Sequence, residues 1–416
     1  MEKQLNVPKL RFSEFEGKWV KKKLIDICDK IIDGTHFSPK SIEGNRKYIT
    51  SKNIRNTGLD LLNCNYISEE EHDWIYKRCP VKFGEILLTK DGANVGNCCL
   101  NTLYEEFSLL SSVAVLNGKK EILQNGFLLQ ILQSNYGIKE ISNIVSGQAI
   151  TRITLEKIKK IELNISFLPE QIKITSFLST VDNKLTHLKK KKSLLEQYKK
   201  GVTQKIFSQE LRFKDVKGED FMEWKEMKLG EVGESYNGLT GKTKENFGTG
   251  KPYIQYKQIF DDSKIDISRF DFVDIREKEN QNIVIFGDAF FTVSSETPEE
   301  VGMASVLLDE VGELYLNSFC FGYRATSLDI INPYFSRYLF RSESFRKDVV
   351  VLAQGSTRFN ISKTQFMKLV IKLPSFPEQT KIANFLSAID DKINHSGMQI
   401  EKLELWKKGL MQQMFC

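Results

Sequence analysis

The chain has 416 residues, enough for two or three domains, and its 41% hydrophobic and 27% charged residues are typical of a globular protein. No apolar run is long enough to cross a bilayer, and the N-terminal MEKQLNVPKLRF lacks the apolar core of a signal peptide. Seven cysteines without a CxxC pair or zinc spacing fit a reducing compartment. We therefore expect a cytoplasmic protein with no membrane partner, and the net charge of +6 is compatible with nucleic acid.

The first region, from Trp19 to about Leu168, has the texture of short strands and helices between turns. Residues 47–50 and 84–89 are predicted strands, because β-branched and aromatic residues alternate there between turn signals. Residues 126–134 and 154–160 are predicted helices. This mixture predicts an α+β unit.

A lysine-rich stretch follows, in which apolar residues recur at alternating steps of four and three. Only Lys192 and Lys199 interrupt the series, so the pattern predicts a long helix with a coiled-coil seam that needs a partner. The seam residues are Ile174, Leu178, Val181, Leu185, Leu188, Leu195, Val202 and Ile206.

The second half of the chain repeats the first. Pro377-Glu378-Gln379 repeats Pro169-Glu170-Gln171 at an offset of 208 residues, and this offset holds without a gap from Gly147/Gly355 to Phe207/Phe415. Tyr253-Ile254 corresponds to Tyr48-Ile49, residues 287–292 to 84–89, and Val301-Gly302 to Val95-Gly96. Between these anchors the two halves diverge, which predicts a shared scaffold with different loops.

The fold class is therefore α+β, with two tandem α+β units that are each followed by a long helix. The predicted boundaries are an N-terminal arm and first unit at 1–168, a helix at 169–208, a junction at 209–222, a second unit at 223–374 and a helix at 375–416. The two helices are expected to pair as an antiparallel coiled coil. With flush ends, the numbers of facing residues sum to 588, and Lys192 lies opposite Ser396.

Enzyme motifs are missing from the sequence. An amino-methyltransferase needs an Asp/Asn-Pro-Pro-aromatic loop, but Asn332-Pro333-Tyr334-Phe335 lacks the second proline and is predicted to start a helix. Gly238-Leu239-Thr240-Gly241-Lys242-Thr243 has two residues between its glycines where a phosphate-cradling loop has four. The four histidines form no cluster with metal-ligand spacing. The prediction is that the chain has no catalytic residues, no metal site and no cofactor of its own.

Polar loops supply candidate DNA contacts, because Lys, Arg, Asn and Gln are the side chains that read base edges in the major groove. An ordinary capped turn or solvated loop is the competing interpretation for each residue. The candidates in the first half are His36, Lys52, Asn53, Arg55, Gln148 and Arg152. Those in the second half are Lys242, Lys244, Gln255, Lys257, Gln258, Ser356, Arg358 and Asn360.

With these features the sequence resembles the specificity subunit of a Type I restriction–modification system, over nearly the full chain. The most specific part of the resemblance is the repeated block of a Gly-containing polar loop, a β-like segment, Pro-Glu-Gln and a heptad helix. The stretch Val7-Pro8-Lys9-Leu10-Arg11-Phe12 is also typical of the family. The resemblance transfers no individual base contact to these loops.

The resemblance implies a non-catalytic subunit with two target recognition domains, each of which reads one half of a bipartite site in double-stranded DNA. The helices would set the spacing and dock two methyltransferase (M) subunits, and restriction/translocase (R) subunits would join them. S-adenosylmethionine, ATP and Mg are expected on those partner subunits only. Two rival hypotheses are a self-contained DNA methyltransferase or nuclease with an unrecognised site, and a scaffold that does not read DNA.

Overall fold

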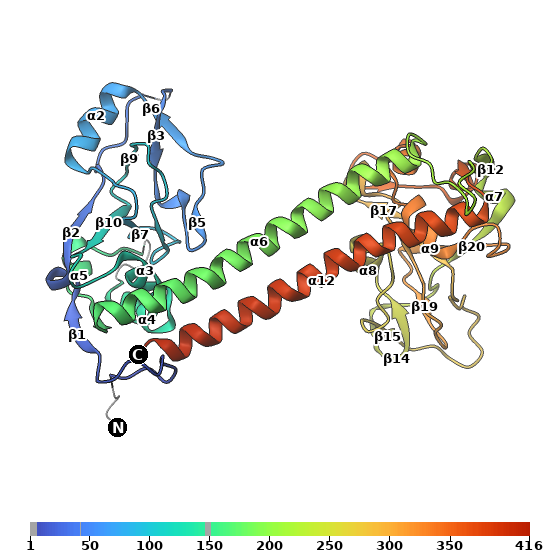
Figure 1. Ribbon diagram of the computed structural model, residues 1–416. Coiled ribbons are helices and arrows are strands. Elements are labelled where there is room, and N and C mark those ends of the chain that lie inside the picture. Colours follow the sequence, from blue (N-terminus) through green and yellow to red (C-terminus); the bar gives the residue numbers. More distant parts are fainter. Residues whose placement is uncertain (1–5, 42, 146–150) are drawn as a thin grey trace. The chain divides into compact units, whose positions relative to one another are not determined.

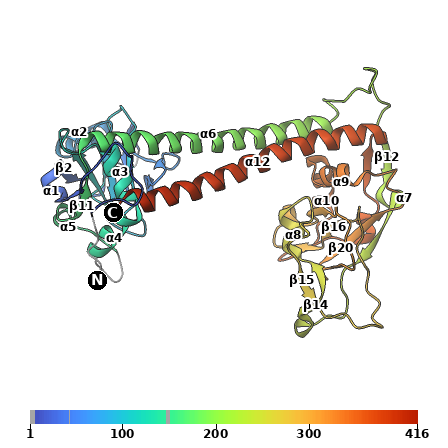
Figure 2. The same ribbon diagram turned by 60° about the horizontal axis from the view of Figure 1, so that its bottom comes forward.

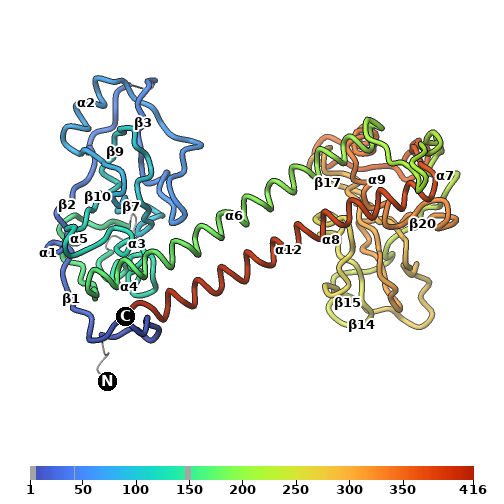
Figure 3. The backbone as a smooth tube through the Cα atoms, in the orientation of Figure 1, coloured from blue at the N-terminus to red at the C-terminus, as the bar shows by residue number. Residues whose placement is uncertain are grey.

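The computed structural model describes residues 6–41, 43–145 and 151–416, and it divides into two compact units (Figure 1). Unit 1 consists of Met1–Lys189 and Met398–Cys416, and unit 2 of Lys190–Gly397. Two long helices, α6 (Leu168–Phe207) and α12 (Phe376–Met414), each contribute one end to each unit, as the backbone trace shows (Figure 3). Among the described residues, no helix is both long and apolar enough to span a membrane.

Unit 1 is built around a four-stranded antiparallel sheet in the order β2-β10-β7-β8. A second sheet has the order β6-β3-β9, with β3 antiparallel to β6 and parallel to β9. The strands are β1 Val20–Lys23, β2 Cys28–Asp33, β3 Arg46–Ile49, β4 Ile54–Arg55, β5 Gly58–Leu59, β6 Asn65–Ile67, β7 Ile86–Thr89, β8 Cys98–Leu100, β9 Ser108–Leu109, β10 Val113–Gly118 and β11 Glu162–Ile165. The helices are α1 Leu24–Ile27, η1 Ser51–Asn53, α2 Glu69–Arg78, α3 Asn125–Gln133, α4 Asn135–Ile144 and α5 Leu155–Lys159.

Unit 2 repeats this plan with a sheet in the order β13-β20-β16-β18 and a second sheet in the order β15-β14-β19. Its strands are β12 Lys225–Lys228, β13 Gly233–Asn237, β14 Phe247–Ile254, β15 Asp271–Val273, β16 Ala289–Thr292, β17 Ser294–Ser295, β18 Ala304–Val306, β19 Tyr315–Leu316, β20 Cys320–Ala325, β21 Phe359–Asn360 and β22 Val370–Leu373. Its helices are α7 Leu229–Val232, η2 Lys244–Asn246, α8 Tyr256–Asp261, η3 Pro298–Glu300, α9 Pro333–Leu339, α10 Glu343–Val351 and α11 Lys363–Phe366. Within this unit α9 lies beside α12, and β14 and β15 lie farther from that helix (Figure 2).

The predicted duplication is confirmed strand by strand. Tyr48 and Ile49 pair in parallel with β9, and Tyr253 and Ile254 pair in the same way with β19. The predicted strands at 47–50 and 84–89 are β3 and β7, and the predicted helices at 126–134 and 154–160 are α3 and α5. Asn332 caps α9 by accepting a hydrogen bond from the Tyr334 amide (2.9 Å), so the Asn-Pro stretch starts a helix as predicted.

The seam residues of the long helices pack antiparallel within each unit. In unit 1, Ile174 and Leu178 share a core with Leu410 and Met414, and in unit 2, Val202 and Ile206 share one with Ile382 and Leu386. Lys407 pairs with Asp182 in unit 1, and Lys199 pairs with Asp390 in unit 2, both at 2.5 Å. The Lys192 ammonium lies 3.8 Å from where a Cβ on Gly397 would stand, beside the buried Ser396. These pairs confirm the predicted direction and agree with the predicted register to within one residue.

The repeated Pro-Glu-Gln stretch fastens each helix start to its unit. Glu170 is buried and accepts two hydrogen bonds from Arg11 (2.7 and 2.8 Å), and Glu378 is buried and accepts two from Arg212 (3.4 and 3.2 Å). The glutamine that follows each glutamate is buried and donates to two backbone carbonyls. Because a carboxylate without its partner is costly to bury, each Leu-Arg-Phe stretch is tied to the helix that begins far away in sequence.

Candidate nucleic-acid interface

Five polar loops of unit 1 meet at one end of its four-stranded sheet. They are residues 33–40, 50–56, 90–97, 110–112 and 151–153, and we call them the first loop face. Three of these loops, 33–40, 90–97 and 110–112, converge because β2 and β7 end where β8 and β10 begin, as an antiparallel sheet requires. The 50–56 loop joins them through the Ser51 amide, which donates to the Ser112 hydroxyl (3.1 Å). Backbone bonds join the loops, from Ser111 to Thr35 (2.8 Å), from Lys90 to Ser112 (2.9 Å) and from Gly92 to Thr151 (3.0 Å).

A chain of charged groups runs through the first loop face. The Lys90 side chain is 2% exposed, and its ammonium lies 3.0 Å from Asp33 and 3.8 Å from Asp91. Arg152 Nε lies 3.2 Å from the other oxygen of Asp91, and His36 Nε2 lies 3.7 Å from Asp33. The buried lysine therefore pairs the 90–97 loop with the 33–40 loop, which carries the exposed His36, and Asp91 pairs the same 90–97 loop with the exposed Arg152.

The other first-half candidates separate into exposed and internal side chains. Lys52 is exposed, and Arg55 is partly exposed with Asp60 at 3.6 Å. Asn53 is only 4% exposed, and its amide is used inside the loop: Oδ1 accepts from the Thr50 amide (2.9 Å) and Nδ2 donates to the Asp60 carbonyl (2.9 Å). In this conformation Asn53 shapes the loop and does not present its amide at the surface. Gln148 lies outside the described residues.

Unit 2 has a second loop face at the equivalent end of its sheet, formed by residues 237–240, 255–257, 293–302, 317–319 and 354–361. Val293 donates to the Phe319 carbonyl (2.9 Å), Ile361 donates to the Val293 carbonyl (3.1 Å), and the Tyr256 hydroxyl donates to the Ser294 carbonyl (2.7 Å). The two loop faces thus lie at equivalent ends of equivalent sheets, while their side chains differ.

A glycine at the equivalent position of each loop face forms the same turn. The amide of Gly96 donates to the Thr89 carbonyl (2.9 Å), and that of Gly302 donates to the Thr292 carbonyl (3.0 Å). Both glycines have positive φ, +92° and +65°, a conformation that costs a residue with a Cβ. The predicted match of Val301-Gly302 with Val95-Gly96 therefore has a conformational cause.

Four second-half candidates are exposed on the second loop face. Lys257 lies on the first turn of α8, and Ser356, Arg358 and Asn360 lie on the turn that Gln354 and Asn360 close with two backbone hydrogen bonds (2.9 and 2.8 Å). The partly exposed Gln255 donates its amide to Asp271. These side chains extend outward from backbone that is itself hydrogen-bonded, which limits how far the loop can rearrange.

The remaining three second-half candidates are placed differently. Gln258 is 6% exposed, donates to the Arg269 carbonyl (2.7 Å) and accepts from the Asp266 amide (2.5 Å), so it holds the segment after α8 in place. The Lys242 side chain is 5% exposed and pairs with Glu279 at 2.5 Å, which lowers the pKa of Glu279 to about 2. The structure thus engages Gln258 and Lys242 internally. Lys244 is exposed on η2, outside the second loop face.

Some residues at the loop faces were not singled out from the sequence. Nothing in the sequence indicated that Lys90 is buried, because a lysine after a β-strand is normally solvated. Phe37 and Phe319 are exposed on the first and second loop faces, and nothing in the sequence distinguishes them from core phenylalanines. Asn53 did carry a signal, since Thr50 and Asn53 have the spacing of a capping box. Among the described residues, no group of three His, Cys, Asp or Glu side chains is arranged to hold a metal ion.

Comparison with known proteins identifies the class to which this duplicated fold belongs. Residues 16–197 and 222–405 each match the model of the Type I restriction modification DNA specificity domain. The two matches cover most of the chain, and the chain therefore belongs to this family. Its role is DNA recognition as the non-catalytic specificity subunit of a Type I restriction–modification system.

Individual relatives agree with the family assignment. The chain is 25% identical to the Type I restriction enzyme MjaVIII specificity subunit of Methanocaldococcus jannaschii, over 80% of this chain and 79% of the relative. It is 23% identical to the putative type I restriction enzyme MjaX specificity subunit of the same organism, over 98% and 95%. The fold is similar to the crystal structure of a Type-I restriction-modification system S subunit from M. genitalium, with a TM-score of 0.60, 16% identity and 99% coverage of both chains. It is also similar to a chain from a study of complex assembly and conformational transition of the type I R-M system, with a TM-score of 0.58, 14% identity and coverage of 97% and 98%.

Proposed function

We propose that each unit reads one half of a bipartite site in double-stranded DNA through its loop face. The observation that carries this proposal is the repeated scaffold with unlike side chains. Asp33 and Lys90 of unit 1 occupy the strand-end positions that Asn237 and Val293 occupy in unit 2. Two faces of the same geometry but different chemistry suit two different half-sites.

The proposed contacts are the exposed and partly exposed candidates. On the first loop face they are His36, Lys52, Arg55 and Arg152, and on the second they are Gln255, Lys257, Ser356, Arg358 and Asn360. Lys244, outside both faces, is a candidate phosphate contact. Lys and Arg supply the salt-dependent attraction to phosphates, while bidentate Arg and Gln contacts discriminate guanine and adenine. Asn53, Gln258 and Lys242 support the loops from inside.

The two long helices are proposed to set the spacing between the half-sites and to dock two methyltransferase subunits, with restriction/translocase subunits completing the complex. S-adenosylmethionine, ATP and Mg belong to those partners in this proposal, and this chain contributes recognition alone. Its proposed location is the cytoplasm, where the DNA and the partner subunits are found.

The test is an exchange of one unit. The full complex is expressed with residues 19–168 replaced by the equivalent unit of a relative, and the methylated adenines in cellular DNA are mapped. One half of the methylated sequence should change while the other half and the gap are retained. A change in both halves, or in neither, contradicts independent reading.

A further inference from the structure

In each unit, one side chain hydrogen-bonds both to a segment that carries proposed DNA contacts and to an edge strand of the four-stranded sheet. This segment follows β3 in unit 1 and β14 in unit 2. In unit 1 this side chain is Gln133, the last residue of α3. Its amide Nε2 donates to the Asn56 carbonyl (2.9 Å), at the end of the 50–56 loop, and to the Cys98 carbonyl (2.8 Å) on β8. A single amide therefore joins the loop to the strand.

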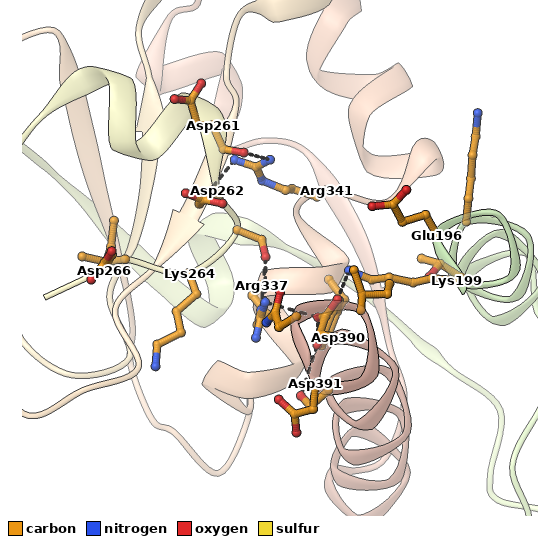
Figure 4. Close-up of a pocket in the computed structure, with 18 of the residues that line it drawn as sticks. Glu196, Lys199, Asp261, Asp262, Lys264, Asp266, Arg337, Arg341, Asp390 and Asp391 are labelled. Carbon is orange, nitrogen blue, oxygen red and sulfur yellow. Dashed lines mark hydrogen bonds and ion pairs between the residues drawn. The ribbon is translucent and has the colours of Figure 1, made fainter. Parts of the chain in front are cut away.

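Arg341 occupies the same place in unit 2, 208 residues later. Its Nε donates to the Ala304 carbonyl on β18 (2.6 Å), and Ala304 corresponds to Cys98 in the numbering that matches Val301 to Val95. Its terminal nitrogens donate to four consecutive carbonyls at the end of α8, those of Ile259, Phe260, Asp261 and Asp262, at 2.9, 3.0, 3.4 and 2.7 Å. Figure 4 shows the Arg341 side chain extended toward Asp261 and Asp262 at the wall of a cleft of about 1300 Å³.

The chemistry of the two residues matches the segments that they hold. The last carbonyls of a helix have no intrahelical partner, and a cation at that end is favoured by the helix dipole. A guanidinium carries five N–H donors in a planar fork, whereas a glutamine amide carries two. Unit 2, whose loop contains the helix α8, uses the guanidinium, and unit 1, whose loop is a single 3-10 turn and a short hairpin, uses the amide. Burial lowers the pKa of Arg341 to about 10, so the side chain remains charged at neutral pH.

In unit 1 the contact is made at Asn56, where the 50–56 loop ends, and in unit 2 it is made at the end of α8 that lies outside the second loop face. The helix α8 begins at Tyr256, directly after Gln255, and its first turn carries Lys257, while Arg341 holds its other end. We propose that Arg341 and Gln133 are positioning residues: they contact no DNA, but each fixes the reading segment of its own unit and so sets how well that unit discriminates its half-site. This inference rests on the proposed reading of half-sites by the two loop faces.

The test uses the complex with its methyltransferase partners and duplexes that carry the methylated sequence mapped for the wild type. One duplex is intact, and two others have one half-site or the other scrambled. Arg341→Met removes the donors at similar length, Arg341→Gln installs the amide of the first unit, and Gln133→Leu removes that amide. If a released segment holds its binding conformation a tenth of the time, apparent affinity for its half-site falls about tenfold.

We expect Arg341→Met to reduce discrimination at the half-site of unit 2 by about tenfold and to leave the other half-site unchanged. Gln133→Leu should give the reverse pattern, and Arg341→Gln should retain more discrimination than Arg341→Met. Equal losses at both half-sites overturn the inference, and wild-type discrimination in Arg341→Met or in Gln133→Leu overturns it for the unit concerned. Should Arg341→Met fail to fold, Gln133→Leu decides: wild-type discrimination at the half-site of unit 1, or a loss shared by both half-sites, refutes the positioning role.

Two controls separate this inference from the proposed function. Lys257→Ala alters a proposed contact without touching Arg341, and an exchange of residues 223–374 replaces the whole second unit. If both change recognition of the second half-site but Arg341→Met does not, only the positioning role fails. If neither changes it, the proposed reading by the second loop face fails.

Discussion

The buried lysine of the first loop face offers a quantitative test of how that face is held together. Lys90→Val removes the ammonium that lies 3.0 Å from Asp33 and 3.8 Å from Asp91. Two carboxylates are then left close together without their shared cation. Valine is chosen because unit 2 has Val293 at this position of its sheet.

Removal of one partner from a buried ion pair costs about 3–5 kcal/mol, because the remaining charge is neither solvated nor paired. Asp33 and Asp91 are 12% and 23% exposed and keep some contact with water, so we expect a loss of about 2–3 kcal/mol from the free energy of unfolding of unit 1. The double variant Lys90→Val/Asp33→Asn reproduces the Val293 and Asn237 of unit 2 and removes one stranded carboxylate. Its stability should return to within about 1 kcal/mol of the wild type.

Native-state hydrogen exchange followed by mass spectrometry measures both units in one experiment. Peptides from β7 should lose protection in Lys90→Val and regain it in the double variant, while peptides from the equivalent strand β16 serve as an internal control. A loss below about 1 kcal/mol in β7 refutes the role given to the ion pair. So does a double variant that is no more stable than the single one.

Three further predictions concern the helices, the arms and pH. One heptad added to each long helix in facing positions lengthens the pair by about 10 Å, so selection from a duplex library should show a gap longer by about three base pairs or a collapse of specific binding, with unchanged half-sites. Arg11→Met should destabilise unit 1 by about 3 kcal/mol in urea unfolding, while leaving the exchange of unit 2 amides unchanged, because it strands the buried Glu170. Burial lowers the pKa of His72, so the unfolded chain takes up its proton first and unit 1 should lose stability as pH falls below about 6.5; His72→Gln should flatten that slope between pH 7 and 5.5.

The features that could be predicted from the sequence are those that periodicity and repetition encode. A heptad spacing determines which helix face is buried, and a constant offset of 208 residues shows that two helices close two related units, so their antiparallel pairing followed. The side chains that bind the Pro-Glu-Gln stretches could not be predicted from the sequence, because the Arg11 that neutralises Glu170 lies 159 residues away. No local pattern indicates which distant cation meets a given carboxylate.

The direction of polar side chains in loops was the least predictable part of the candidate interface. Asn53, Gln258 and Lys242 have the residue types of base or phosphate contacts, yet each is engaged internally. An amide or ammonium in a loop is stabilised equally well by a backbone carbonyl, by a carboxylate or by water, and composition does not distinguish among them. Asn53 is the exception, because its spacing from Thr50 indicates the capping contact, whereas no local pattern marks Gln258 or Lys242 as turned inward.

The division of the long helices between the units has a consequence for the order of folding. Unit 2 is continuous in sequence, from Lys190 to Gly397, whereas the core of unit 1 includes Met414 and Phe415. The ring of Phe415 packs against Trp19 (6.2 Å) and Phe127 (5.7 Å), so this core stays incomplete until residues 414 and 415 have left the ribosome. During synthesis the unit that is begun first is therefore completed last, and a ribosome that stalls after Gly397 releases a chain in which unit 2 is whole while unit 1 lacks part of its core.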